Sequence, residues 1–257
     1  MSKSKHLLSS SLGKKLIMSL TGLFLCTFLI VHLIGNLQLF YNDQGKSFND
    51  YAYFMTHFPP IRIISYLLYA FIVIHAIYAL VLTIHNRKAR PVRYAVYRGS
   101  ENSAWNSRNM GILGTVLLVF IVTHMSNFWW KYHNDDVPYI EYRTDLASQK
   151  TTATELVGDE YTDYVKYIDN DVEVLKAKDL YKQVQFAFKN IFLVALYVIA
   201  MIALSFHLIH GFKSAFQTLG FNHKKYAPII RFLGIWLFGV AIPIAFAAMP
   251  LYFYFSS

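Results

Sequence analysis

The chain has 257 residues, of which 55% are hydrophobic, 17% are aromatic and only 15% are charged. Soluble domains contain about 25% charged and 45–50% apolar residues, so this composition argues against a soluble enzyme and against a disordered chain. The single cysteine, Cys26, excludes a disulfide framework, a cysteine-based metal site and cofactor attachment through a C-x-x-C-H motif. The net charge of +9 is typical of Lys and Arg that flank membrane spans. Because no basic stripe interleaves with aromatic residues, no nucleic-acid partner is expected.

Five segments are apolar over the roughly 20 residues that a helix needs to cross a bilayer. In chain order they are Leu16 to about Phe40, Ile61–Ile84, Met110–Trp130, Val184 to about Phe212, and Pro228–Phe255. The first segment is too long for a signal peptide, and no small-residue cleavage site follows it. Two prolines inside the last segment, Pro243 and Pro250, predict a bend there. The predicted fold class is an all-α membrane protein with five transmembrane helices, the first four of which form a bundle.

The distribution of charge orients these helices. Basic residues gather in the N-terminal tail, between the second and third segments and around the end of the fourth: Lys3, Lys5, Lys14, Lys15, Arg87, Lys88, Arg90, Arg93, Arg98, Arg108, Lys213, Lys224, Lys225 and Arg231. Since Lys and Arg favour the cytoplasmic side, the N-terminus is expected in the cytoplasm. Three regions follow: residues 1–132 hold the cytoplasmic tail and spans one to three, 133–183 form an extracytoplasmic insert, and 184–257 hold spans four and five.

The insert at 133–183 carries most of the acidic residues of the chain, among them Asp159 and Glu160. Between Thr154 and Lys182 its apolar residues recur at helix-like spacing, which predicts short helices. We therefore expect a small cap on the outer side rather than a domain with its own core.

Four of the five segments carry a histidine inside the apolar run: His32, His75, His124, and His207 together with His210. An ionisable residue at this depth is costly and is by default a candidate for function. At 1.5 Å per residue from the nearest cytoplasmic basic residue, His32 lies about 25 Å deep and His124 about 24 Å. On the same count His75 lies about 18 Å deep and His207 about 9 Å. The histidines therefore form an outer pair and an inner pair.

Two imidazoles on facing helices are the ligand set that a bis-histidine haem iron requires. Zinc needs a third or fourth ligand, and apart from Cys26 no Asp, Glu or Cys lies near these depths. A proton relay needs carboxylates in the spans, and the five segments contain none. The pattern favours two b-type haems, with His32 and His124 binding the outer one and His75 and His207 the inner one.

Several motifs resemble a known family. Ser11-Leu-Gly-Lys-Lys15, Thr21-Gly-Leu-Phe24 and His32-Leu-Ile-Gly-Asn36 are similar to the start of the succinate dehydrogenase/fumarate reductase cytochrome b subunit, in its single-chain, five-helix, dihaem type. The stretch Phe206–Gln217, which reads FHLIHGFKSAFQ, is similar to the fourth-span motif of that family. The resemblance implies that His207, and not His210, binds iron.

The chain departs from the family in two places. The outer insert is longer than the family pattern leads one to expect. Leu204-Ser205-Phe206 stands where some dihaem members have a glutamate, so a transmembrane proton path through that carboxylate is not expected here.

The resemblance implies a membrane-anchor subunit that binds no succinate and passes electrons between an iron–sulfur subunit and a membrane quinone. Dihaem members usually use menaquinone. The implied partners are a flavoprotein subunit and an iron–sulfur subunit on the cytoplasmic face of a bacterial inner membrane. The quinone is expected beside the outer haem, where Asn49, Asp50 and His57 are candidates because quinone carbonyls need hydrogen-bond donors.

Two alternatives remain open. A dihaem cytochrome b of a membrane hydrogenase or formate dehydrogenase often has two histidines in one helix, as His207 and His210 are here. A small transporter usually has broken helices or inverted repeats near the midplane. The helix-breaking residues of this chain, Pro243 and Pro250, lie in the one span that has no histidine.

Overall fold

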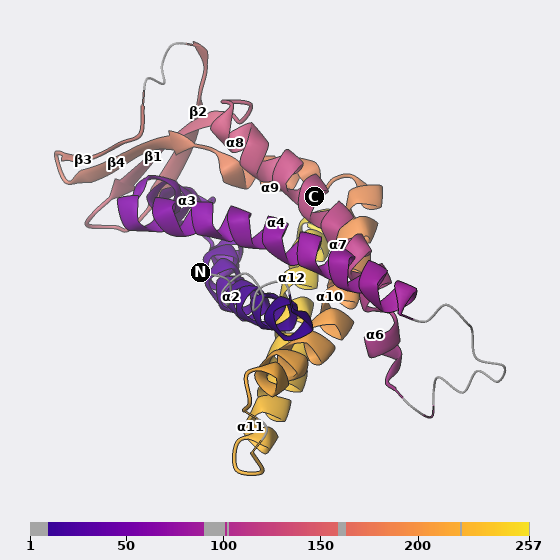
Figure 1. The fold of residues 1–257 in the computed structure, drawn as a ribbon. Helices are drawn as coiled ribbons and strands as arrows, with labels where there is room; N and C mark the ends of the chain where they lie inside the picture. The colour runs from indigo at the N-terminus through magenta and orange to yellow at the C-terminus, as the bar shows by residue number, and fades with distance from the viewer. Residues whose placement is uncertain (1–9, 90–100, 102, 159–162, 222, 257) are drawn as a thin grey trace. The chain divides into compact units, whose positions relative to one another are not determined.

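The structure is a computed structural model, and it describes residues 10–89, 101, 103–158, 163–221 and 223–256 (Figure 1). Five helical stretches in this part of the chain are long and apolar enough to cross a membrane: Ser11–Phe40, Pro59–Lys88, Met110–His133, Ile191–Thr218 and Ala227–Phe255. By length and composition the predicted five spans are confirmed, and the chain has the character of a multi-pass membrane protein.

Several of these stretches combine more than one element. The first comprises α2 (Ser11–Leu37) and the 3₁₀-helix η1 (Gln38–Phe40), and the second is α4 (Pro59–Lys88). The third joins α7 (Met110–His124), the π-helix η2 (Met125–Trp130) and α8 (Lys131–His133). The fourth is α10 (Ile191–Thr218), and the fifth joins α11 (Ala227–Phe232), the π-helix η4 (Leu233–Ala241) and α12 (Ile242–Phe255). Shorter helices are α3 (Lys46–His57), α6 (Trp105–Arg108) and α9 (Leu180–Ala187).

The fourth span begins later than predicted. Val184 belongs to the separate helix α9, and α10 starts only at Ile191. The intervening Asn190 caps α10, because its Oδ1 accepts a hydrogen bond from the backbone N–H of Phe192 at 2.9 Å. Because apolar residues lie on both sides of Asn190, hydropathy alone predicts one continuous span where the structure has two helices.

The chain divides into two compact units, to which the long helices contribute different portions. The first unit holds the described residues within 1–30, 65–120 and 197–247, and the second holds the described residues within 31–64, 121–196 and 248–257. In the first unit α7 packs on α10 through Leu113, Leu117 and Ala203. In the same unit α10 meets η4, where Phe212 stacks on Phe238 with ring centres 4.6 Å apart.

A polar contact joins α10 to η4 close to Pro243. Gly239 lies in η4, four residues before Pro243, which has no N–H to donate to the preceding helical turn. The hydroxyl of Ser205 on α10 donates to the Gly239 carbonyl. Gly239 allows this close approach, because a Cβ there would overlap the side chain of Ile209. Ser205 therefore provides a donor for a backbone carbonyl in the turn before Pro243.

The second unit contains a four-stranded antiparallel sheet (Figure 1). Its strands are β1 (Tyr139–Asp145), β2 (Thr151–Leu156), β3 (Val165–Asp169) and β4 (Val172–Lys178), in the order β2-β1-β4-β3. Ile140, Tyr142 and Leu175 form a small buried cluster on one face. The prediction of an all-α fold is therefore wrong for the insert, and so is the prediction of short helices between Thr154 and Lys182.

Alternation and turn geometry account for these strands. In β1 every second residue is buried, namely Ile140, Tyr142 and Thr144, which is the period of a strand packed on one face. A two-residue turn joins β3 to β4, and Asn170 and Asp171 have φ of 46° and 63°. Positive φ at both central residues is the type I′ turn that suits the twist of a hairpin, and Asn and Asp adopt it more readily than most residues.

Helix α3 is tied to the sheet by charged contacts. Lys46 Nζ lies 2.5 Å from the Glu173 carboxylate, and Lys166 Nζ lies 2.7 Å from the Asp50 carboxylate. The hydrogen bond from Lys46 holds the pKa of Glu173 below its ordinary value, although burial opposes this. The buried cluster of Ile140, Tyr142 and Leu175 gives the insert a small core, so the prediction of a cap without its own core is wrong. The ion pairs of Lys46 and Asp50 anchor the insert to α3.

Candidate functional site

The inner histidine pair lies within the first unit. His75 comes from α4 and His207 from α10, and their ring centres are 6.3 Å apart with the ring planes at 59°. Each side chain is partly buried. The ring contact joins His75 to His207, whereas His210 follows three residues later on α10 and is also partly buried.

Helices α2 and α7 supply the neighbours of this inner pair. The hydroxyl of Thr21 lies 3.1 Å from Nδ1 of His75. A Cβ on Gly22 would come within 3.3 Å of the His75 ring, and one on Gly114 within 4.0 Å of the His207 ring. Glycine at these two positions therefore leaves room for the imidazoles beside the helix backbone. Nδ1 of His207 is buried with no hydrogen-bond partner among the residues that the structure describes.

The outer histidine pair lies within the second unit. His32 comes from α2 and His124 from the end of α7, with ring centres 5.7 Å apart and ring planes at 87°. Asn36, one turn after His32, donates to the backbone carbonyl of His32 at 2.7 Å, and its amide nitrogen lies 3.4 Å from both ring nitrogens. The π-helix η2 begins directly after His124, and the ring of Phe128 on η2 packs edge to face on that histidine at 5.4 Å. Single π-helical turns are frequent at functional sites.

The donor set and the spacing of both pairs fit a haem iron. Two imidazoles that bind one metal ion from opposite sides, with metal–nitrogen bonds of about 2 Å, hold their ring centres roughly 6 Å apart. Both measured separations, 6.3 and 5.7 Å, lie near this value. Within the described ranges no group of three or more His, Cys, Asp or Glu is arranged to hold a metal ion. Two-ligand pairs suit a metal whose other ligands come from a macrocycle, whereas zinc would need further protein ligands.

The three quinone candidates lie on α3 in the second unit, and Asn49 is the most buried of them, at 1% exposed. Its amide nitrogen donates to the Tyr142 hydroxyl and to the Asp179 carboxylate, each at 2.9 Å. Its carbonyl accepts from the backbone N–H of Tyr181 at 3.0 Å. Burial raises the pKa of both Asp179 and Tyr142. Asn49 therefore joins α3, the sheet and α9 through its full set of polar atoms.

Asp50 also takes part in the contact between α3 and the sheet. Its two carboxylate oxygens accept from the Tyr164 hydroxyl at 2.6 Å and from Lys166 at 2.7 Å. The Tyr164 ring stacks on Tyr53 of α3 with ring centres 3.6 Å apart.

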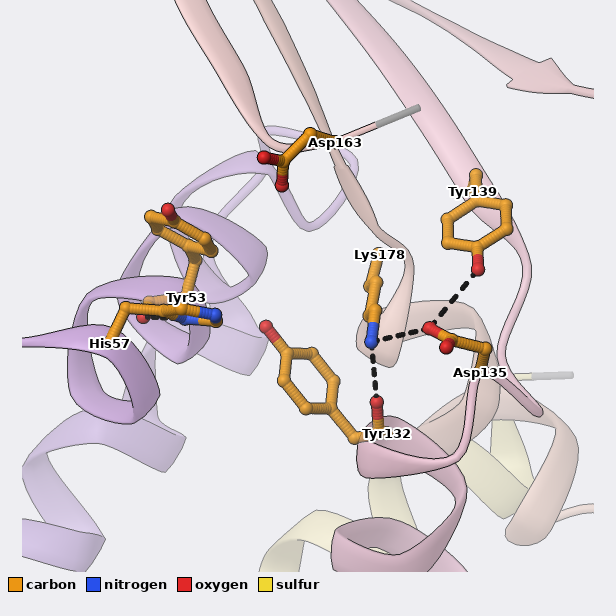
Figure 2. A pocket seen from close by; sticks show the side chains of 7 residues that line it. All are labelled: Tyr53, His57, Tyr132, Asp135, Tyr139, Asp163 and Lys178. Carbon is orange, nitrogen blue, oxygen red and sulfur yellow. Dashed lines mark hydrogen bonds and ion pairs between the residues drawn. The ribbon is translucent and has the colours of Figure 1, made fainter. Parts of the chain in front are cut away.

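His57, the third candidate, lines a cavity of about 270 Å³ (Figure 2). Its ring stacks on Tyr53 at 4.0 Å, and its Nδ1 lies 3.0 Å from the Tyr53 carbonyl. Figure 2 shows the Tyr132 hydroxyl directed toward His57 across the cavity. Lys178, on the other side, binds the Asp135 carboxylate at 2.6 Å and the Tyr132 carbonyl at 2.9 Å. Sequence reasoning did not identify Tyr132 or Lys178, because only the fold brings a span end and β4 to the same cavity.

Five basic residues used for orientation lie outside the described part of the chain, namely Lys3, Lys5, Arg90, Arg93 and Arg98. The acidic residues Asp159 and Glu160 of the insert also lie outside it. No family model, no characterised protein and no solved structure matches this chain. The assignment of a function therefore depends on the residues and geometry described above.

Proposed function

We propose that this chain is the dihaem cytochrome b membrane-anchor subunit of a succinate:quinone oxidoreductase, acting in either succinate dehydrogenase or fumarate reductase. In this role the chain binds no dicarboxylate and passes electrons between an iron–sulfur subunit and a membrane quinone, with menaquinone as the expected quinone. The first four spans form the haem-binding bundle. The proposal places the chain in a bacterial cytoplasmic membrane, with its N-terminus inside and the flavoprotein and iron–sulfur subunits on the cytoplasmic face.

One observation carries the proposal: two separate histidine pairs, each formed by two different apolar helices, with ring centres 5.7 and 6.3 Å apart. A lone buried histidine is commonly a structural residue, but imidazoles paired at this separation on four helices match bis-histidine ligation. The motifs around Thr21, His32 and His207 support the specific family.

Each residue then has a defined task. His75 and His207 hold one haem, and His32 and His124 hold the other. Bound haem supplies one-electron transfer, while the protein sets ligand orientation, spacing and the surrounding dielectric. The apolar faces of α2, α4, α7 and α10 keep water away from the imidazoles.

At the outer side, His57 is the candidate best suited to meet a quinone. The polar atoms of Asn49 and Asp50 bind other residues of the fold. His57 lines a cavity with the Tyr132 hydroxyl, and its Nδ1 is oriented by a backbone carbonyl. An imidazole and a phenol supply the donor and proton acceptor that a quinone head group needs.

The test is an absorption spectrum of the purified chain expressed with an ample haem supply. We expect low-spin b-type bands on reduction with dithionite and two haems per polypeptide by pyridine haemochrome assay. A colourless protein would reject the proposal and favour the transporter alternative. In the complex purified from native membranes, reduction of these haems by succinate separates this family from hydrogenase or formate dehydrogenase subunits, whose haems would respond to hydrogen or formate instead.

A further inference from the structure

The hydroxyl of Thr21 lies between the backbone of its own helix and a histidine of the inner pair. Thr21 is only 4% exposed. Its Oγ1 lies 2.8 Å from the carbonyl oxygen of Ile17, 3.2 Å from that of Met18 and 3.1 Å from Nδ1 of His75. Three polar atoms therefore surround one hydroxyl group.

The single proton of that hydroxyl decides the direction of each hydrogen bond. Carbonyl oxygens can only accept, and a threonine in a helix commonly donates to the carbonyl four residues earlier. If Thr21 instead gave its proton to His75, two oxygen–oxygen contacts would be left without a hydrogen between them. The arrangement that satisfies all three neighbours has Thr21 donating to the backbone and accepting from Nδ1–H of His75.

This direction fixes the tautomer of His75. A neutral imidazole has one N–H, so a proton on Nδ1 leaves Nε2 with a free lone pair, which is the form that binds a metal. Gly22, the next residue of α2, allows the close approach, since a Cβ there would lie only 3.3 Å from the His75 ring. Thr21 and Gly22 together hold the ring in orientation and in protonation state.

We infer that Thr21 is a positioning residue for the inner haem: it accepts from Nδ1–H of His75 and so keeps Nε2 available to iron. This inference rests on the proposed function for its metal. An acceptor on Nδ1–H also makes the imidazole a stronger electron donor, and outer partners of this kind typically change metal affinity 10–100-fold. Nδ1 of His207 has no such partner in the described part of the chain, so the effect is confined to one ligand of the inner pair.

The experiment compares three variants of the 257-residue chain. Thr21→Val removes the acceptor at nearly constant volume, and Thr21→Ser restores it. Thr27→Val is the matched control, because Thr27 on the same helix also donates to the carbonyl four residues earlier, at 3.1 Å, and is exposed. Haem content, midpoint potentials by redox titration and low-spin electron paramagnetic resonance spectra are measured for each.

We expect Thr21→Val to lose inner haem on dilution or to show a raised midpoint potential and a shifted spectrum for one haem. Thr21→Ser and Thr27→Val should match the wild type. Unchanged haem content, potentials and spectra in Thr21→Val would overturn the inference while leaving the proposed function intact. If the wild type contains no haem, the proposed function fails, and ¹⁵N spectra of labelled histidine then decide the inference alone: His75 must be protonated on Nδ1 in the wild type and not in Thr21→Val.

Discussion

The two histidine pairs are held in different ways. In the inner pair one ring, His75, has a defined hydrogen bond to Thr21 at 3.1 Å, and glycines lie beside both rings. In the outer pair the rings are closer, at 5.7 Å, and nearly perpendicular, with Asn36 one turn from His32. The inner pair is thus oriented by small residues and a hydroxyl, and the outer pair by an amide and aromatic packing.

Helices α2 and α7 have a role in both pairs. Each carries a glycine beside an inner histidine, Gly22 or Gly114, and ten residues later a histidine of the outer pair, His32 or His124. The spacing is the same on the two helices. The two helices that carry the histidines of the outer pair therefore also carry the glycines that leave room for the inner pair. Each pair can be tested separately by substitution.

Removing one of the four paired histidines should give the largest effect, and it tests directly whether the two pairs bind separate haems. We expect His75→Ala or His207→Ala to lose the inner haem and keep the outer one, because a single imidazole remains at that site. His32→Ala or His124→Ala should do the opposite. The measurement is the haem-to-protein ratio, which should halve in each case, together with the spectrum of the haem that remains.

The four variants control for one another. The spectra must sort into two groups of two, matching the pairs seen in the structure. Loss of both haems from one substitution, retention of both, or a different grouping would contradict the pairing.

A smaller effect should come from adding a methyl group beside His75. In Gly22→Ala the new Cβ lies 3.3 Å from the ring, so the imidazole must shift by a few tenths of an ångström. We expect a shifted spectrum and reduced occupancy for the inner haem only. Gly114→Ala should act more weakly, since its Cβ would lie 4.0 Å from His207.

Gly211→Ala is the matched control for both glycines. A Cβ at that position would have no contact within 4 Å among the described residues, apart from its chain neighbours and the nearby backbone of its own helix. All three substitutions gain the same helix propensity, about 1 kcal/mol, so a difference in haem properties reports the contact with histidine. Equal haem spectra in the three variants would show that clearance at Gly22 has no role.

Acid should affect the outer pair before the inner pair. The pKa of Glu173 is lowered by its hydrogen bond from Lys46, so this carboxylate stabilises the fold above the pKa of the unfolded chain. That contribution is lost as pH falls through the lower, folded pKa, below the ordinary glutamate value of about 4.3. Because the sheet and the outer pair share one compact unit, we expect the outer haem spectrum to change first as the pH falls below about 4.

Glu173→Gln tests whether protonation of Glu173 causes the acid response of the outer haem. It removes the titration and weakens the contact with Lys46, so its outer haem should respond less steeply to acid than that of the wild type. An acid response of equal size and midpoint in both proteins would assign the effect to other groups.

The sequence predicted the spans well because hydropathy over 20 residues is a strong, local signal. It failed in the insert, where apolar residues such as Val165 and Ile168 fit a helical spacing although they belong to β3. Two features decided the fold there. One is nonlocal, the pairing of β1 with β4. The other is local, a two-residue turn at Asn170 and Asp171 that does not contain the usual glycine.

In the candidate site, too, local sequence patterns were predictive and contacts between distant residues were not. The four histidines were found from depth along single helices, which is a local count. The role inferred for Thr21 and the cavity at His57 depend on contacts between residues far apart in the sequence, such as Thr21 and His75, which are 54 positions apart. Thr21-Gly22 stood out in the sequence as a motif and His75 as a candidate ligand, but nothing in the sequence indicated that Thr21 contacts His75.

The smallest expected effect concerns His210. The ring contact joins His75 to His207, and His210 lies three residues later on α10, about 60° short of a full turn from His207. His210→Asn should therefore keep both haems, with the inner spectrum unchanged, because asparagine preserves a polar group without offering an imidazole. A halved haem-to-protein ratio in this variant would identify His210 as the ligand. His207→Asn would then retain the inner haem, and the inner pair would consist of His75 and His210 instead of His75 and His207.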